Sequence, residues 1–274
     1  GETIQQSSIA KNNWLSDPLS RIVIEKNNAT ATFLEKLQQG SLKFEECADI
    51  IWGIKPYQVG HGTPPQTKEM MEQRIYHSAT KVDERWKPLV VGSNVDRYLL
   101  KTESLQYILY GPNLMYPSNQ ARIEGEKILM RQTSDCLRAV SDQHKYYPQN
   151  SVFVITVKET AMPSSFLMLL LNSKLLNHVY GIENPQKGKA FAEIKPSVIK
   201  ALPIRVPKEF NAFVAKADQM LSAHAELHAL TKRTLDLLRS KYTLPALSRA
   251  LENWPGLEFK GFLAELKKAK VQLT

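Results

Sequence analysis

The hydrophobic and polar positions divide the chain into three stretches. Residues 1–49 are first rich in Asn and Gln and then contain one helical pattern, ATATFLEKLQQG, which Thr30 is expected to cap and Gly40 to end. From residue 50 to 207, short β-branched and aromatic runs alternate with Gly, Pro, Asn and Ser; they include KPLVVG, QYILYG, EKILMRQT and SVFVITV. From residue 208 the apolar spacing becomes helical. We therefore expect an α+β fold with an N-terminal strap and helix (1–49), a mixed-sheet domain (50–207) and a helical tail (208–274).

Two segments predict longer helices. PSSFLMLLLNSKLLNHVYG predicts one buried helix over residues 166–180, capped by Ser164 or Ser165 and closed by Gly181, because its first turns are apolar on every side. After residue 207, apolar residues at spacings of three and four predict a helix of about 45–50 Å that serves as a strut or packs against another helix. Pro245 is expected to end it, and residues 251–273 predict a final amphipathic helix with a basic end.

The composition narrows the functional classes. The 274 residues are 43% hydrophobic and carry a formal charge of +9, which favours a polyanionic partner: nucleic acid first, an anionic membrane surface second. A basic balance that only keeps the protein in solution is the alternative. The longest strongly apolar run, residues 166–171, is far below the roughly 20 residues of a membrane span, so we expect no membrane segment.

The cysteines and the chain ends add two expectations. Cys47 and Cys136 lie far apart and form no CxxC motif, which favours a reducing, cytoplasmic location. The chain begins with Gly1 rather than Met, and FLAELKKAKVQLT stops without a turn signal, so we expect an excised fragment.

Motifs for catalysis are missing from the sequence. GxGxxG, GxxxxGK[ST], GxSxG and HExxH do not occur. In HAELH, His224 and His228 share a helix face with Glu226 between them, but a third ligand is lacking, and a solvated helix face is the better interpretation. We therefore predict no catalytic residue and no metal site, and keep a metal-dependent hydrolase at HAELH as the weaker alternative.

Loops rich in hydrogen-bond donors are more prominent. Gln can pair with adenine through two hydrogen bonds, and Lys can meet guanine or a phosphate. The segment GIKPYQVGHGTPPQTKE presents Lys55, Tyr57, Gln58, His61, Gln66 and Lys68; later loops offer Asn94, Arg97, Arg131, Gln132, Arg138, Gln186, Lys187 and Lys189. Ordinary basic surface loops are the alternative for each residue.

Seven short sequence segments follow one another in a characteristic order. GIKPYQVGHGTPPQT, WKPLVVGSNVDRYLL, YILYGPNLMYP, EKILMRQT, YYPQNSVFVIT, FLMLLLNSKLLNHVYG and IKALPIRVP follow one another from about residue 49 onward. This series resembles the TaqI-like C-terminal specificity domain, the target recognition half of type II restriction-modification methyltransferases. The closing segment also looks like the tail that follows this domain in such enzymes.

The resemblance implies a function for the chain. It implies a bacterial domain that binds double-stranded DNA, reads a short sequence and positions the duplex for base flipping by an N-terminal adenine-N6 methyltransferase domain, in a parent with or without endonuclease activity. The NPPY-type motif and the S-adenosylmethionine loop of that family are absent. We therefore expect a fragment that binds DNA without methylating it and holds no cofactor, with S-adenosylmethionine and Mg²⁺ belonging to the missing domains.

Residue roles follow from the same resemblance. Residues on family-typical phrases are expected to serve the fold or the phosphates, and less typical loop residues to read bases. The phosphate candidates are Lys55, Arg97, Arg131 and Lys189; the base-reading candidates are Gln66, Lys68, Arg74, Gln132, Gln186 and Lys187. The alternative function is a protein-interaction module whose long helix docks a separate methyltransferase or nuclease subunit, and the oligomeric state stays open.

Overall fold

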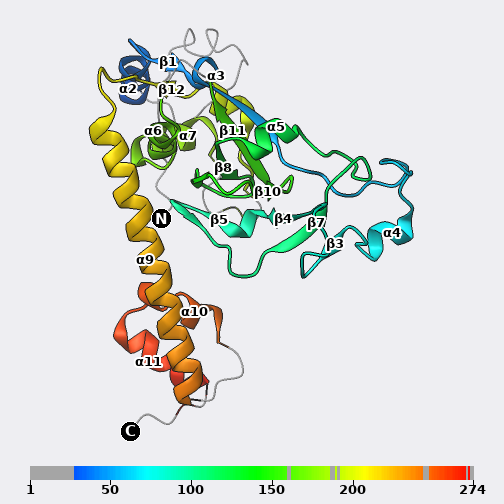
Figure 1. Ribbon diagram of the computed structural model, residues 1–274. Coiled ribbons are helices and arrows are strands. Elements are labelled where there is room, and N and C mark those ends of the chain that lie inside the picture. Colours follow the sequence, from blue (N-terminus) through cyan, green and yellow to red (C-terminus); the bar gives the residue numbers. More distant parts are fainter. Residues whose placement is uncertain are drawn as a thin grey trace, which may run out of the picture. The chain divides into compact units, whose positions relative to one another are not determined.

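The computed structural model describes residues 28–158, 162–185, 189, 192–242, 247–269 and 271. The chain forms two compact units, one ending at Asp218 and the other beginning at Gln219. The first unit contains all the strands and the shorter helices α2 to α8, and the second contains most of the long helix α9 together with α10 and α11 (Figure 1). The described chain is of the expected α+β class.

The first unit is built on two four-stranded sheets where the sequence predicted one mixed sheet. The first sheet is antiparallel throughout and has the order β2 (Ala48–Trp52), β11 (Val152–Val157), β8 (Lys127–Arg131), β9 (Ala139–Asp142). The second has the order β10 (Tyr147–Pro148), β4 (Trp86–Val90), β7 (Gln106–Leu109), β3 (His77–Ser78), and its β10–β4 pair is parallel. The predicted apolar runs lie on β4, β7, β8 and β11, and they divide between the sheets.

Two small strand pairs and several short helices complete the first unit. β1 (Leu42–Lys43) pairs with β12 (Pro203–Ile204), and β5 (Val95–Asp96) pairs with β6 (Leu99–Leu100). The helices are α2 (Asn28–Gln38), α3 (Phe44–Cys47), α4 (Lys68–Glu72), α5 (Gln120–Glu124), α6 (Ser164–Leu171), α7 (Lys174–Glu183) and α8 (Pro196–Lys200), with a 3₁₀ turn at Gly92–Asn94. Because α2 begins at Asn28, Thr30 lies inside it and does not cap it. Gly40 follows its end with φ +70°, as expected of a glycine that closes a helix.

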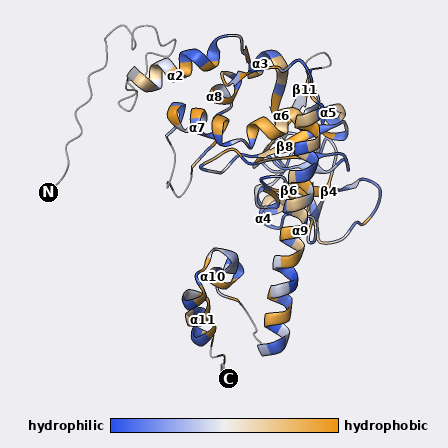
Figure 2. Ribbon diagram, turned by 90° about the vertical axis from the view of Figure 1, so that its left-hand side faces the viewer, coloured by the Kyte–Doolittle hydropathy of each residue, from blue (hydrophilic) through white to orange (hydrophobic). Residues whose placement is uncertain are grey.

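The apolar helix predicted over residues 166–180 is two helices. The side chain of Ser173 accepts a hydrogen bond from the N–H of Leu176 and caps α7, while Asn172 turns its amide toward the backbone of Ala139 on β9. Gly181 lies within α7 instead of closing it. α6 is hydrophobic along most of its length (Figure 2) and packs against β8, β9 and β11, so the predicted burial of this segment is correct.

The tail contains the long helix that the spacing predicted. α9 (Asn211–Tyr242) has 32 residues and a length of about 48 Å. Pro245 lies outside the described residues. The final segment is not one helix: Ser248 caps α10 (Arg249–Glu252), a 3₁₀ turn follows at Trp254–Gly256, and α11 runs over Phe259–Lys268. In the second unit, Leu251, Leu266 and Val271 are buried against side chains that include Leu238 and Tyr242 of α9.

Candidate nucleic-acid interface

Two arginines lie directly opposite each other where β8 ends and β9 begins. The ladder pairs Met130 with Ala139, and the N–H of Arg131 donates to the carbonyl of Arg138 over 3.1 Å, which continues the register by one position. Residues directly opposite in an antiparallel pair project from the same face of the sheet, and like charges there repel. We call Arg131 and Arg138 the arginine pair. Repulsion between its members makes it a place where a bound anion would be stabilising.

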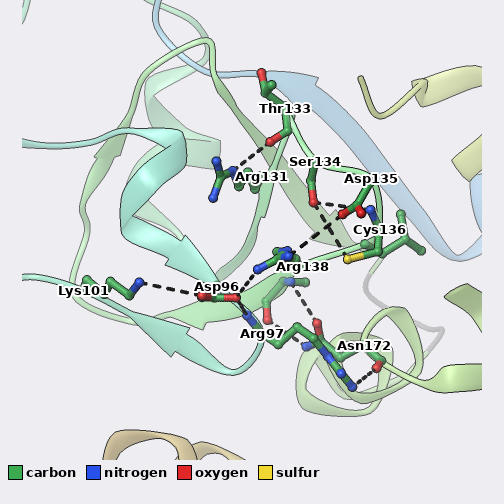
Figure 3. A network of polar contacts seen from close by, with 12 residues as sticks. Asp96, Arg97, Lys101, Arg131, Thr133, Ser134, Asp135, Cys136, Arg138 and Asn172 are labelled. Atoms are coloured by element: carbon green, nitrogen blue, oxygen red, sulfur yellow. Dashed lines mark hydrogen bonds and ion pairs between the residues drawn. The ribbon is translucent and has the colours of Figure 1, made fainter. Parts of the chain in front are cut away.

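One side of the arginine pair is held by a carboxylate from another hairpin. Asp96 ends β5, and its Oδ1 lies 3.0 Å from Nη1 of Arg138 and 2.9 Å from the backbone N of Arg97, which donates to it (Figure 3). Its Oδ2 lies 3.7 Å from Nζ of Lys101. Burial raises the pKa of Asp96, but the Arg97 N–H and the charges of Arg138 and Lys101 outweigh that effect and hold the pKa below its usual value.

The turn that carries Asp96 is strongly constrained. Tyr98 has φ +55°, a left-handed conformation that is rare for a bulky side chain, yet its ring is buried. Its N–H donates to the carbonyl of Ala139, and its hydroxyl lies 3.4 Å from the carbonyl oxygen of Leu169. These contacts fix the turn to β9 and α6.

Asn172 joins this turn to the sheet. Its side-chain amide accepts from the N–H of Ala139 and donates to the carbonyl of the same residue, at 3.0 and 2.7 Å. Its own carbonyl accepts from Nη2 of Arg97 at 2.6 Å. Arg97, a predicted phosphate ligand, therefore directs this part of its guanidinium to the scaffold.

The charges around the arginine pair do not cancel. Nε of Arg131 donates to the carbonyl of Thr133 at 2.8 Å, and its two terminal nitrogens form no hydrogen bond or ion pair with another described residue. Nη2 of Arg138 lies 4.0 Å from Asp135. Four cationic side chains against two carboxylates leave a formal charge of +2; the cations are Arg97, Lys101, Arg131 and Arg138, and the carboxylates are Asp96 and Asp135.

Gln66, a predicted base reader, is instead buried inside its loop. Its side chain is 2% exposed, its Oε1 accepts from the N–H of Gln58, and its Nε2 donates to the carbonyls of Pro56 and Asn113. Gly62 in the same loop has φ +82°, and a Cβ there would lie 2.3 Å from the Asn113 carbonyl oxygen. The amide that was expected to face DNA thus holds the loop together, and no local sequence signal distinguishes such a glutamine from an exposed one.

The other predicted residues are distributed over separate parts of the unit. Lys68 and Arg74 are exposed on α4 and just after it, and α4 lies well away from β5 in Figure 1. Nζ of Lys55 donates to Gln58, and Lys189 is exposed. Gln132 is half-buried directly after Arg131. Gln186 and Lys187 lie outside the described residues. Among the candidates that the structure describes, Arg131 belongs to the arginine pair, and Arg97 and Gln132 lie next to it.

The predicted DNA ligands did not include three charged residues of this site, Asp96, Lys101 and Arg138. Arg138 had been noted only as a basic loop residue, and Asp96 was not considered. The segment MRQTSDCLR could have indicated this pair, because a hairpin whose loop lies between the two arginines places them opposite each other on adjacent strands. Asp96 comes from a different hairpin, 42 positions from Arg138.

Two other kinds of feature are absent from the described residues. There, no group of three or more His, Cys, Asp or Glu side chains is placed to hold a metal ion. None of the described helices is long and apolar enough to cross a membrane.

Comparisons with known proteins identify the region around this site. Residues 87–204 match the family of the TaqI-like C-terminal specificity domain, a narrower range than the sequence resemblance suggested, and residues 207–274 match a domain of unknown function, DUF8810. No curated protein matches the chain.

Two solved structures are similar at low identity. The HsdS subunit from Thermoanaerobacter tengcongensis shares 13% identity over 83% of this chain, with a TM-score of 0.35. A chain from a structure of complex assembly and conformational transition in the type I R-M system shares 14% identity over 77%, with a TM-score of 0.37. This chain spans 44% of the length of each. The family match begins within β4 and extends to the end of β12, so it includes the arginine pair: residues 87–204 match the TaqI-like C-terminal specificity domain.

Proposed function

We propose that this chain binds double-stranded DNA and reads a short sequence on behalf of a restriction-modification enzyme. The observation that carries the proposal is the arginine pair, two like charges held directly opposite each other within a specificity domain. The terminal nitrogens of Arg131, which bond to none of the other described residues, and the excess positive charge around them support an anionic ligand. DNA supplies such ligands at a regular spacing.

A phosphodiester suits this site chemically. A guanidinium presents its N–H groups in a planar fork that matches phosphate oxygens, and a phosphate between two guanidiniums relieves their repulsion. Such contacts orient the duplex but carry no sequence information. Base reading then falls to neighbouring loop residues, for which Gln132, next to Arg131 in the chain, is our first candidate. Lys68, Arg74, Gln186 and Lys187 remain further candidates, and Lys55 and Lys189 further phosphate ligands.

The methylation step is assigned to a different domain. Our proposal is that an adenine-N6 methyltransferase domain of the same parent binds S-adenosylmethionine and flips the target base, while this chain supplies the grip on the duplex. Any nuclease activity, with its Mg²⁺, would also belong to the parent. In this arrangement the chain itself performs no chemistry, and we propose a cytoplasmic location for it.

The test is selection from a pool of randomised duplex DNA across a salt series. Enrichment of a short motif at moderate salt is expected. The logarithm of the binding constant falls linearly with the logarithm of the salt concentration, and Arg131→Ala should reduce the steepness of that slope by about 0.9, the value of one phosphate contact. Arg138→Ala should do the same. Arg205→Ala is the matched control, because Arg205 is exposed, carries the same charge and follows β12 on a different strand pair. Binding without enrichment, with a slope unchanged in both variants, would contradict the proposal.

A second candidate function rests on α9. Leu227, Leu230 and Leu237 are 56%, 53% and 61% exposed, and their spacing of three and seven places them along one side of the helix. A line of exposed leucines favours a protein partner such as a methyltransferase or nuclease subunit. Leu227→Gln with Leu230→Gln should then abolish co-purification with that subunit and leave DNA binding intact. If the wild-type chain does not bind the subunit, this second candidate is ruled out.

A further inference from the structure

The carboxylate of Asp96 contacts Arg138 of the arginine pair, where the proposed function places a DNA phosphate. Building on the proposed function, we infer that Asp96 acts as an internal competitor: in the free protein it holds Arg138 and attracts Lys101, and on binding these cations exchange Asp96 for a phosphate oxygen. Asp96 thereby weakens the grip of the domain on DNA of any sequence.

The contacts of Asp96 favour such an exchange. Oδ1 is well satisfied, since it accepts from both the Arg97 N–H and Nη1 of Arg138. Oδ2 is held more loosely, because Nζ of Lys101 lies 3.7 Å away, beyond hydrogen-bond distance. The side chains of Asp96, Arg138 and Lys101 are 33%, 33% and 38% exposed. An incoming phosphate can therefore reach the cations without opening the core.

The scaffold decides which partner moves. Asp96 is fixed by its own backbone, because the turn after it is anchored through Tyr98 to Ala139 and through Arg97 to Asn172. Arg138 and Lys101 have long, flexible side chains that can turn to a new oxygen. On binding, the carboxylate stays in place and the cations reorient, so a residual repulsion between Asp96 and the phosphate persists in the complex.

This repulsion acts on specific and non-specific complexes alike. Non-specific binding depends almost entirely on phosphate contacts, whereas the specific complex adds contacts to bases. A fixed penalty at one phosphate lowers both affinities by the same factor. The penalty weakens non-specific binding and leaves the ratio of specific to non-specific affinity unchanged.

The experiment compares Asp96→Asn with Asp83→Asn at low salt. Asparagine keeps an oxygen for the Arg97 N–H and removes the charge. Asp83 is a partly exposed aspartate paired with Arg85, so its replacement changes the net charge equally. We expect Asp96→Asn to tighten binding to a random-sequence duplex about two- to fivefold, the range for a partly exposed ion pair, and Asp83→Asn to have a smaller effect. In an Arg138→Ala background, the gain from Asp96→Asn should fall to that of the control.

The inference and the proposed site can each be overturned separately. If Asp96→Asn binds DNA more weakly than the wild type, the inference is overturned, because Asp96 would then position Arg138 for DNA. An affinity equal to that of Asp83→Asn also overturns it. Arg131→Ala and Arg138→Ala that both leave DNA binding unchanged overturn the proposed site itself, independently of Asp96. Thermal unfolding checks that Asp96→Asn is folded; Asp96→Ser, whose hydroxyl can also accept from the Arg97 N–H, is the second variant and carries the same expectation.

Discussion

The Lys127 ammonium and the Asp142 carboxylate form a fully buried ion pair, with 2.6 Å between Nζ and Oδ2. They are directly opposite each other on β8 and β9, on the same face of the sheet as Arg131 and Arg138. Burial lowers the pKa of Lys127, and the hydrogen bond and charge of Asp142 oppose that shift. The same strand pair therefore carries complementary charges where it is buried and like charges where it is partly exposed. This contrast separates a buried pair of opposite charges from the pair to which our proposal assigns an external anion.

Removing Asp142 should strongly destabilise the protein. Its carboxylate also accepts from the N–H groups of His144 and Tyr146, so Asp142→Ala leaves a buried ammonium and two backbone donors without partners. We expect a loss of about 3–5 kcal/mol in the free energy of unfolding, measured with urea. Glu84→Ala, which breaks an exposed pair with Lys81, is the control and should change it by less than about 1 kcal/mol. Equal losses in the two variants would contradict this account of the buried pair.

Asn172→Ala should loosen the junction between the β5–β6 turn and the sheet. The variant removes both side-chain hydrogen bonds to Ala139 and leaves that residue's buried N–H without this acceptor. The expected loss is about 2–4 kcal/mol in the free energy of unfolding, because two hydrogen bonds are lost and one buried donor is left without a partner. Asn119→Ala, which removes the exposed cap of α5, should cost about 1 kcal/mol. Thermal unfolding that is no lower for Asn172→Ala than for this control would count against the junction.

Gln66→Ala should affect stability and not sequence choice. It leaves the Gln58 N–H and the carbonyls of Pro56 and Asn113 without their partner, which should lower the free energy of unfolding by about 1–3 kcal/mol. Gln73→Ala, at an exposed glutamine that donates to Glu69, should be nearly neutral. A variant that stays as stable as the wild type but selects a different DNA motif would restore Gln66 as a base reader.

His77 should make stability depend on pH. Burial, and then the charge of Arg74, lower the pKa of His77 to about 4. The hydroxyl of Tyr57 accepts from the Tyr76 N–H and lies within hydrogen-bond distance, 2.9 Å, of Nδ1 of His77. Because the unfolded chain binds a proton near pH 6.5 and the folded one only near 4, stability is full above 6.5 and declines as the pH falls through that window.

The pH prediction is checked by urea unfolding at pH 7 and pH 5. His77→Gln should reduce the difference between the two midpoints, since glutamine does not titrate. His144→Gln, at an exposed histidine, should leave that difference as it is in the wild type. The prediction fails if both variants retain the full difference.

Features that depend on neighbours in the chain were predictable. β11 follows from the run SVFVITV, and α9 from leucines and alanines repeated every three or four positions. The helix predicted over residues 166–180 failed at Asn172, because hydrogen bonds to Ala139, 33 positions away, outweigh continuation of the helix. The sequence likewise did not predict that the strands divide into two sheets, because the local pattern of a strand is the same whichever partner it pairs with.

For the candidate site, the positive net charge and the family-typical phrases predicted a DNA partner, and Arg131 was among the predicted ligands. By itself, then, the sequence determined the class of fold, most of the regular elements and the family of the central region. The tertiary structure alone decided that Gln66 faces inward, that Arg138 stands opposite Arg131 and that Asp96 lies between the cations. The physical reason is range: propensity and periodicity act over a few residues, whereas Asp96–Arg138 and Arg97–Asn172 join positions 42 and 75 residues apart and exist only once the chain has folded back on itself.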